Sequence, residues 1–311
     1  MRYSVIIPAG ALVAFGAGFV LPSWVTFLMT IALAKGLVVL GLLLLMRAGL
    51  VSFGQGLYYC LGAYVVGVGG NYLGTQEVLI LMPLAVLVCV ALASVIGMLL
   101  CRYRDIFFAM FSMAFSMILY GVLVKSSSFG SSDGYNVLPP QLFGWAPSAD
   151  NATILPYCLA VIAALSVAYL IYRYLKSPMG YAGEAVRENE IRVEYLGISV
   201  RRVIYTKYLI AAGMAGLGGS ITALAAGHID PEMSYWTTSG EFVFIALMGG
   251  TGHVLAPLLG AILFELLRTY AFQISPYTWQ MILGLALLAI ILYLPKGIWS
   301  VIDRVRGRAS L

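Results

Sequence analysis

The chain has 311 residues, of which 61% are hydrophobic and only 10% are charged, and its mean hydropathy is +0.95. A soluble domain carries about 25% charged residues, so this composition excludes an ordinary soluble protein. Long apolar runs repeat along the chain and indicate a helical membrane protein, because a transmembrane barrel shows short alternating strands instead. The net charge of +5 does not indicate nucleic-acid binding, since the basic residues lie between the apolar runs.

The apolar runs predict an all-α, polytopic transmembrane helical bundle of about 8–10 spans, with the whole chain, 1–311, forming one domain. The expected spans are 4–21, 24–46, 50–70, 77–100, 105–124, 153–172, 204–226, 240–251, 255–272 and 278–294. Segment 240–251 is much shorter than the ~20 residues that a full span needs. We expect it to be half of a broken helix or a re-entrant segment.

Basic residues follow every second crossing and therefore orient the spans. Arg2, Arg47, Arg102 and the stretch 173–202 all fall on one side, which the positive-inside rule assigns to the cytoplasm. We therefore expect a multi-pass membrane protein with both termini inside. The same count places residues 177–200 and the tail, 295–311, in the cytoplasm.

The longest expected outer loop, 125–152, is rich in Ser, Gly, Pro and Asp, which is typical of turns. The rule that orients the spans places this loop on the outer side of the membrane. Three interpretations stay open for it: a cover over the outer mouth of a pathway, a docking surface, or a plain connector.

Two apolar regions contain dense glycine, Gly49–Gly56 in the first half of the chain and Gly249–His253 in the second. Paired Gly-interrupted segments in the two halves indicate a transporter's substrate route, because backbone leaves helical geometry in a membrane only where protein or a water-filled cavity satisfies it. The alternative is close helix packing through small residues. The predicted pathway residues are Ser52, Gly54, Gln55, Gly56, Gly249, Gly250, Thr251 and His253.

Ionisable residues inside apolar runs are costly and often functional. Lys35 lies near the middle of the second span, and Glu241, Glu265 and Arg268 lie in or near the last ones. Lys35 either pairs with a glutamate for structure or faces the pathway. Glu265 and Arg268 are three residues apart, so we expect them to neutralise each other on one helix face.

Residues 177–200 form a charged, helix-prone island. Ser177 and Pro178 are typical of a helix start, and Gly197 of a helix stop. At helical spacing one face of the expected helix carries Val186, Asn189, Val193 and Leu196. Such an amphipathic helix inserts into a groove on a partner, or else it is a solvated connector between spans.

The motifs resemble those of the branched-chain amino acid ABC importer permeases. SPMGYAGEAVRENEIRVEYLGI is similar to their coupling segment, and GLVSFGQGLYYCLGAY to their first Gly-rich signature. RDIFFAMFSMAFSMI, GSSDG and LMGGTGHVLAPLLGA match further blocks in the same order, so that the resemblance covers nearly all of residues 36–295. At Glu184 the family often has arginine instead.

The resemblance implies a mechanism and a set of partners. A second, related permease subunit would enclose the pathway with this one, two cytoplasmic ABC ATPases would drive alternating access, and a periplasmic binding protein would deliver the solute. The residues implied to contact the ATPase are Glu184, Ala185, Arg187, Glu188, Asn189, Glu190 and Gly197. The remaining surface would contact membrane lipid, in a bacterial inner membrane with loop 125–152 on the periplasmic side.

The chain is not expected to be an enzyme or to hold a cofactor. It has no GxxxxGK[ST] run, so ATP and Mg²⁺ would be bound by the partner ATPases. Relatives by resemblance carry leucine, isoleucine and valine, but also urea and amides, and these substrates stay open. A stand-alone secondary transporter would need its own ion-coupling site, and a membrane-embedded enzyme would need a nucleophile–base pair or metal cluster that the sequence does not offer.

Overall fold

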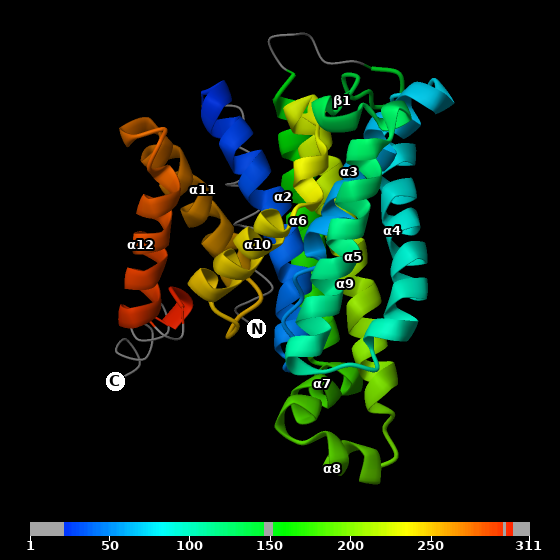
Figure 1. Ribbon diagram of the computed structural model, residues 1–311, viewed down its shortest axis with the longest axis vertical. Coiled ribbons are helices and arrows are strands. Elements are labelled where there is room, and N and C mark those ends of the chain that lie inside the picture. The colour runs from blue at the N-terminus through cyan, green and yellow to red at the C-terminus, as the bar shows by residue number, and fades with distance from the viewer. Residues whose placement is uncertain (1–21, 146–151, 295–296, 301–311) are drawn as a thin grey trace.

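The computed structural model describes most of the chain as a bundle of helices (Figure 1). The described residues are 22–145, 152–294 and 297–300. The predicted span 4–21 and most of the predicted tail, 295–311, lie outside them. Within them the expectation of an all-α polytopic bundle is confirmed, since six helices are long and apolar enough to cross a membrane: α2, α4, α5, α6, α9 and α11.

Six helices make up the main body of the bundle (Figure 1). They are α2 (Ser23–Met46), α3 (Gln55–Leu73), α4 (Val78–Leu100), α5 (Asp105–Lys125), α6 (Ile154–Leu175) and α9 (Val200–Ala226). The long α9 packs against α2, α3 and α4 and so lies at the centre of the bundle. It does so through small residues, which let helix backbones approach closely in a membrane.

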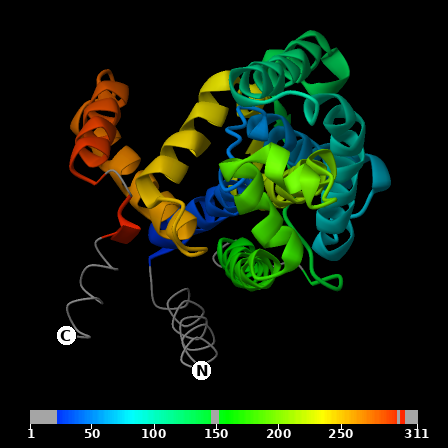
Figure 2. The ribbon, with the colours of Figure 1, turned by 90° about the horizontal axis from the view of Figure 1, so that it is seen from below.

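The last three helices are α10 (Trp236–Gly249), α11 (Ala256–Ile274) and α12 (Trp279–Tyr293). In both ribbon views α11 and α12 stand to one side of the main body, and α10 connects them to it (Figures 1 and 2). The segment 240–251, expected to be half of a broken helix or re-entrant, forms most of the short helix α10. With 14 residues, α10 is about 21 Å long, less than the ~30 Å hydrocarbon core of a bilayer.

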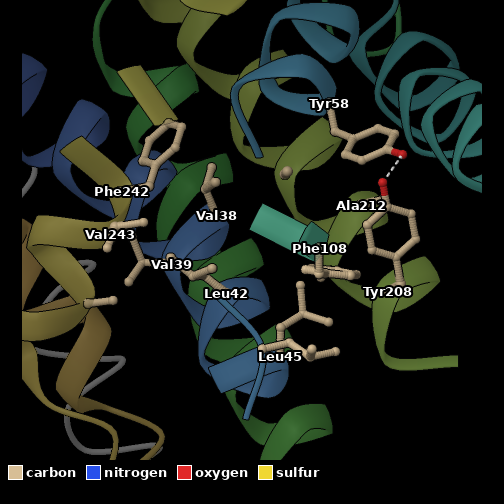
Figure 3. Packing of buried hydrophobic residues seen from close by; sticks show 14 of the residues in the cluster. Val38, Val39, Leu42, Leu45, Tyr58, Phe108, Tyr208, Ala212, Phe242 and Val243 are labelled. Atoms are coloured by element: carbon tan, nitrogen blue, oxygen red, sulfur yellow. Dashed lines mark hydrogen bonds between the residues drawn. The ribbon is translucent and has the colours of Figure 1, made fainter. Parts of the chain in front are cut away.

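Buried apolar side chains from the central helices and from α10 pack together in the core (Figure 3). The residues labelled there are Val38, Val39, Leu42, Leu45, Tyr58, Phe108, Tyr208, Ala212, Phe242 and Val243. The hydroxyls of Tyr58 and Tyr208 lie 2.7 Å apart and satisfy each other. A buried hydroxyl needs such a partner, because the membrane interior supplies no water.

The two ends of the bundle differ. At one end the short helices α7 (Pro178–Glu188) and α8 (Glu190–Tyr195) project beyond the long helices (Figure 1). At the other end β1 (Tyr135–Asn136) pairs antiparallel with β2 (His228–Ile229). The described part of the predicted outer loop thus folds back onto the segment that follows α9. We call these the α7–α8 end and the β1–β2 end.

One predicted span begins later than expected. The apolar run 50–70 predicts a helix from residue 50, but α3 begins at Gln55, and the segment before it is not helical. Gly49 has a φ of +81°, a left-handed conformation that favours glycine and turns the chain after α2. The helix interruption expected from the glycines is therefore present, and it shortens the span.

The approach of α2 to α9 gives a test of the packing. A Cβ added at Gly41 would lie 2.9 Å from both Cα and the carbonyl oxygen of Ala211, whereas one added at Gly121 would meet nothing within 4 Å. We expect Gly41→Ala to destabilise the protein by about 1–3 kcal/mol through overpacking. Thermal unfolding in detergent should show a lower melting temperature for Gly41→Ala than for the control, Gly121→Ala. Equal melting temperatures would contradict the packing described here.

Candidate functional site: a coupling surface, two glycine-rich segments and a charged cavity

The island 177–200 forms two helices, where one was predicted. Ser177 begins α7 as expected, with its Oγ accepting a hydrogen bond from the Gly180 amide at 3.3 Å. The chain breaks at Asn189, which is extended, with φ −162° and ψ 104°, and whose Oδ1 accepts from the Arg192 amide at 3.0 Å. Asparagine is a preferred N-cap, so the local sequence favours a new helix here. Gly197, with φ +79°, follows α8, which confirms the predicted stop.

The predicted shared face of this island is wrong because of that break. Val186 and Val193 are buried, but Asn189 is exposed at the break, and Leu196 is 77% exposed. Apart from Tyr181 on α7, the exposed large apolar side chains of this region lie in and just after α8 instead. We name them the α8 surface: Ile191, Tyr195, Leu196 and Ile198. Exposed apolar patches on a part that projects from the bundle are typical of binding surfaces.

Two ion pairs hold the island against the rest of the chain. Arg47 Nη1 lies 3.0 Å from Glu184 Oε1, and Arg104 Nε lies 2.6 Å from Glu190 Oε1. Two of the residues expected to contact a partner therefore bind arginines of this same chain. Ala185, Arg187 and Glu188 are exposed on α7.

Arg47 also holds the second glycine-rich segment. Its Nε and Nη2 donate to the Thr251 carbonyl at 3.1 and 3.0 Å, and Nη2 donates to the Gly252 carbonyl at 2.9 Å. One guanidinium thus joins α7, the end of α2 and the turn between α10 and α11. The sequence analysis used Arg47 only for orientation. Its position directly before the glycine-rich run Gly49–Gly56 is the sequence signal that could have identified it.

The first glycine-rich segment is closely packed. Ser52 and Gln55 are fully buried. A Cβ added at Gly54 would lie 2.8 Å from the Ser112 carbonyl oxygen, and one at Gly56 would lie 2.7 Å from Ser239 Oγ. The glycines therefore allow the start of α3 to approach α5 and α10.

The second glycine-rich segment is held from two sides. Arg47 binds its carbonyls, and the segment after α12 packs on the other side, where the Ile298 amide donates to the Met248 carbonyl at 2.9 Å. The ring of His253 stacks on Trp299 with centroids 4.2 Å apart. Gly250 is left-handed, with φ +88°, and ends α10.

A cavity of about 740 Å³ lies between α2, α10 and α11, toward the β1–β2 end. One wall is apolar and comes from the first turns of α2, with Trp24, Phe27, Leu28 and Ile31. The residues lining it, all from the described part of the chain, include none of the eight predicted pathway residues. Its volume lies within the range of about 300–1,000 Å³ of small-molecule sites.

The floor of the cavity carries four charged side chains. Lys35 Nζ lies 2.6 Å from Glu265 Oε1 and 3.1 Å from Glu241 Oε2. Arg268 Nη1 is farther from the same carboxylates, at 3.5 Å from Glu241 and 3.9 Å from Glu265. The interpretation that Lys35 pairs with a glutamate is confirmed. Lys35 also lines this cavity, and its place in a pathway stays a prediction. The expected Glu265–Arg268 contact is present but long.

Burial differs across this network. The side chains of Lys35 and Glu265 are 6% and 9% exposed, whereas Glu241 and Arg268 are 23% and 38% exposed. A charge at the bilayer centre costs about 3 kcal/mol, so the buried lysine requires its two carboxylates. The more exposed pair is the part of the network that a solute in the cavity would meet.

Together these features define a polytopic helical membrane protein with a charged cavity and a separate projecting surface. The profile of the family described as "Branched-chain amino acid transport system / permease component" matches residues 24–292. The chain belongs to this family.

Similar proteins carry related names. The high-affinity branched-chain amino acid transport system permease protein LivM of Escherichia coli K12 is 29% identical over 273 residues, covering 81% of this chain and 64% of LivM. LivH of the same organism is 24% identical over 268 residues, covering 80% of this chain and 85% of LivH. The nucleoside ABC transporter permease protein NupB of Lactococcus lactis is 30% identical over 129 residues, 41% of this chain and 35% of NupB. The chain thus spans less than two thirds of the length of LivM. No solved structure matches the chain significantly.

The hydrogen bonds from Arg47 to the turn between α10 and α11, which we call the arginine clamp, give a second prediction. Arg47→Gln removes the charged donor to the Thr251 and Gly252 carbonyls, and a hydrogen bond to a charged group contributes about 1.5–3 kcal/mol. We expect the turn to open more often, so a thiol reagent should modify a Thr251→Cys variant about tenfold faster in the Arg47→Gln background. Thr251 contributes only its backbone carbonyl to these bonds, so the cysteine leaves them intact.

Two controls complete this experiment. Glu184→Gln leaves the bonds to the turn in place and should change the modification rate less. Arg173→Gln removes an exposed arginine at the end of α6 and should change nothing. The clamp is refuted if Arg47→Gln and Arg173→Gln give the same rate.

Proposed function

We propose that this chain is a permease subunit of an ATP-driven ABC importer of a bacterial inner membrane. The importer moves a small solute by alternating access, and the solutes that we propose first are branched-chain or other hydrophobic amino acids. The observation that carries the proposal is the α8 surface, an apolar patch on a helix pair that ion pairs fix outside the membrane helices. In a chain of this family, such a surface fits the groove of an ATPase subunit.

The partners follow from this assignment. Two cytoplasmic ABC ATPases would bind the α8 surface with the exposed residues of α7, a second and related permease would complete the pathway, and a periplasmic binding protein would deliver the solute. The names LivM and LivH, two permeases of one organism that are both similar to this chain, favour a heterodimeric pore. The α7–α8 end and both termini would be cytoplasmic, as the basic residues at Arg47 and 173–202 require.

The contacts supply a route for coupling. Movement of α7 by an ATPase would pull on Arg47 through Glu184, and Arg47 holds the turn between α10 and α11. These two helices carry Glu241 and Glu265 at the cavity. We retain the two glycine-rich segments as the part of the pathway between the cavity and the cytoplasm. Because both segments are closely packed in this structure, that part of the pathway is closed.

Other assignments make different predictions. NupB is named for nucleosides, and by resemblance the family also includes permeases for urea and amides, so the solute class needs direct measurement. A stand-alone secondary transporter would have to use the charged cavity for ion coupling and would need no ATP. The importer requires an ATPase in the purified complex.

Gentle affinity purification from native membranes, with mass spectrometry of the proteins that co-purify, tests the assignment. We expect a Walker-motif ATPase and a second permease. A chain that purifies alone and transports solute into liposomes without ATP would establish the secondary transporter instead.

A single substitution tests the α8 surface. We expect Leu196→Asp to reduce ATPase co-purification and ATP-driven uptake by about tenfold or more, because an apolar anchor in an interface contributes about 2 kcal/mol. Phe143→Asp is the matched control for ATPase co-purification, since Phe143 is 84% exposed and lies in the loop that follows β1. Full co-purification of the ATPase with Leu196→Asp would count against this surface.

A further inference from the structure

The charges around the cavity are arranged to favour a solute that carries both signs. Lys35 and Arg268 face Glu241 and Glu265 on the floor, and Asp230 and Glu232 add two carboxylates near the β1–β2 end. Two cations thus face four carboxylates, which disfavours a free anion. A zwitterion brings no net charge. Its carboxylate and its ammonium group would each take the place of one partner in ion pairs that the network already contains.

Arg268 has the free capacity to receive a carboxylate. Its nearest carboxylate atoms lie at 3.5 and 3.9 Å, beyond a good hydrogen bond, and its guanidinium packs 5.3 Å above the ring of Trp279. No hydrogen bond from this guanidinium is found among the described residues. A planar guanidinium binds a carboxylate through two parallel hydrogen bonds, so Arg268 is suited to that group.

Glu241 is placed to receive an ammonium group. Both of its ion-pair contacts use Oε2, and its side chain is partly exposed to the cavity. Lys35 keeps Glu265 as a close partner at 2.6 Å when Glu241 turns to a solute. The network therefore stays neutralised during the exchange.

The apolar wall lies beside this charged floor. Trp24, Phe27, Leu28 and Ile31 all come from α2, the helix that carries Lys35 one turn further along. An aliphatic side chain attached to the ionic head would lie against this wall and gain about 25 cal/mol for each Å² of apolar surface removed from water.

We propose that this cavity, within one permease subunit, is a binding site for an α-amino acid zwitterion with an aliphatic side chain. Arg268 receives the carboxylate and Glu241 the ammonium group, while the α2 wall contacts the side chain. The proposal rests on the proposed function and adds to it a solute site that this chain forms by itself, separate from the glycine-rich segments.

Direct binding to the purified complete transporter in nanodiscs tests the site, with tritiated L-leucine as the probe. L-leucine amide keeps the ammonium group and 4-methylpentanoate keeps the carboxylate, and both keep the aliphatic side chain. We expect leucine to bind and unlabelled analogues of either kind to compete at least about tenfold more weakly, since each lacks one charge-assisted contact. Equal competition by either analogue overturns zwitterion recognition.

Three variants test the residues. Arg268→Gln and Glu241→Gln should each weaken leucine binding about tenfold or more, and Arg268→Lys should bind with intermediate affinity because it keeps the charge without the planar fork. Arg173→Gln should bind as the parent does. Parental affinity in Arg268→Gln overturns the role of Arg268, and the melting temperature of each variant identifies a loss that comes from unfolding.

A protection experiment leaves every charge in place. Thr269 lines the cavity, so leucine should slow the modification of Thr269→Cys by a thiol reagent, but not that of Ser128→Cys in the exposed 3₁₀ turn after α5. Equal modification of Thr269→Cys with and without saturating leucine overturns the site.

Uptake into proteoliposomes separates the two proposals. ATP-driven leucine uptake that is unchanged in Arg268→Gln would leave the importer assignment standing and remove the cavity site. ATP-driven uptake of another solute, with no leucine binding by the parent, would remove the amino acid site and keep the importer.

Discussion

The buried ammonium of Lys35 constrains the arrangement of the second half of this protein. A charge in the membrane interior needs a partner of opposite charge close to it. For Lys35 the partner carboxylates are Glu241 and Glu265, which come from two other helices, α10 and α11. These helices are therefore tied to α2 near its middle, although α11 and α12 otherwise stand apart from the main body (Figure 2). The cavity is the space on the β1–β2 side of that tie.

A second cation holds the turn that joins the same two helices. Arg47 binds the carbonyls of the turn between α10 and α11, and it also binds α7 through Glu184. The helix α10 is thus attached near its middle, by Glu241, and at its C-terminal end, by the turn after Gly249. A short helix fixed in this way transmits a displacement of α7 to the charged floor more directly than a long helix packed only through apolar side chains.

The sequence predicted the spans well and the contacts between them poorly. Apolar runs determine which segments cross a membrane, so they predicted the short segment that ends at Gly249, but they placed the start of α3 at residue 50 and not at Gln55. Lys35 and Glu241 are 206 positions apart, and no local pattern pairs them. The break at Asn189 was missed because helix-forming residues flank it. By resemblance, the family often has arginine at the position of Glu184. In this chain Glu184 forms an ion pair with Arg47, which is distant in the sequence.

Glycine-rich sequence did not distinguish a lining of the pathway from close packing, because both uses exploit the absence of a side chain. In this structure both segments are closely packed, and their proposed place in the pathway requires them to open. The predicted segments pack against Ser112, Ser239 and Arg47, while the cavity is lined by larger polar and aromatic side chains. Under the two proposals made above, recognition of a solute would fall in the half of the bundle toward the β1–β2 end, and coupling would fall in the half toward α7 and α8. Glu241 and Glu265 lie on the two helices whose connecting turn Arg47 holds. A solute that exchanges with Glu241 would therefore act on the same helices as Arg47, and the two events would be mechanically linked without sharing a residue.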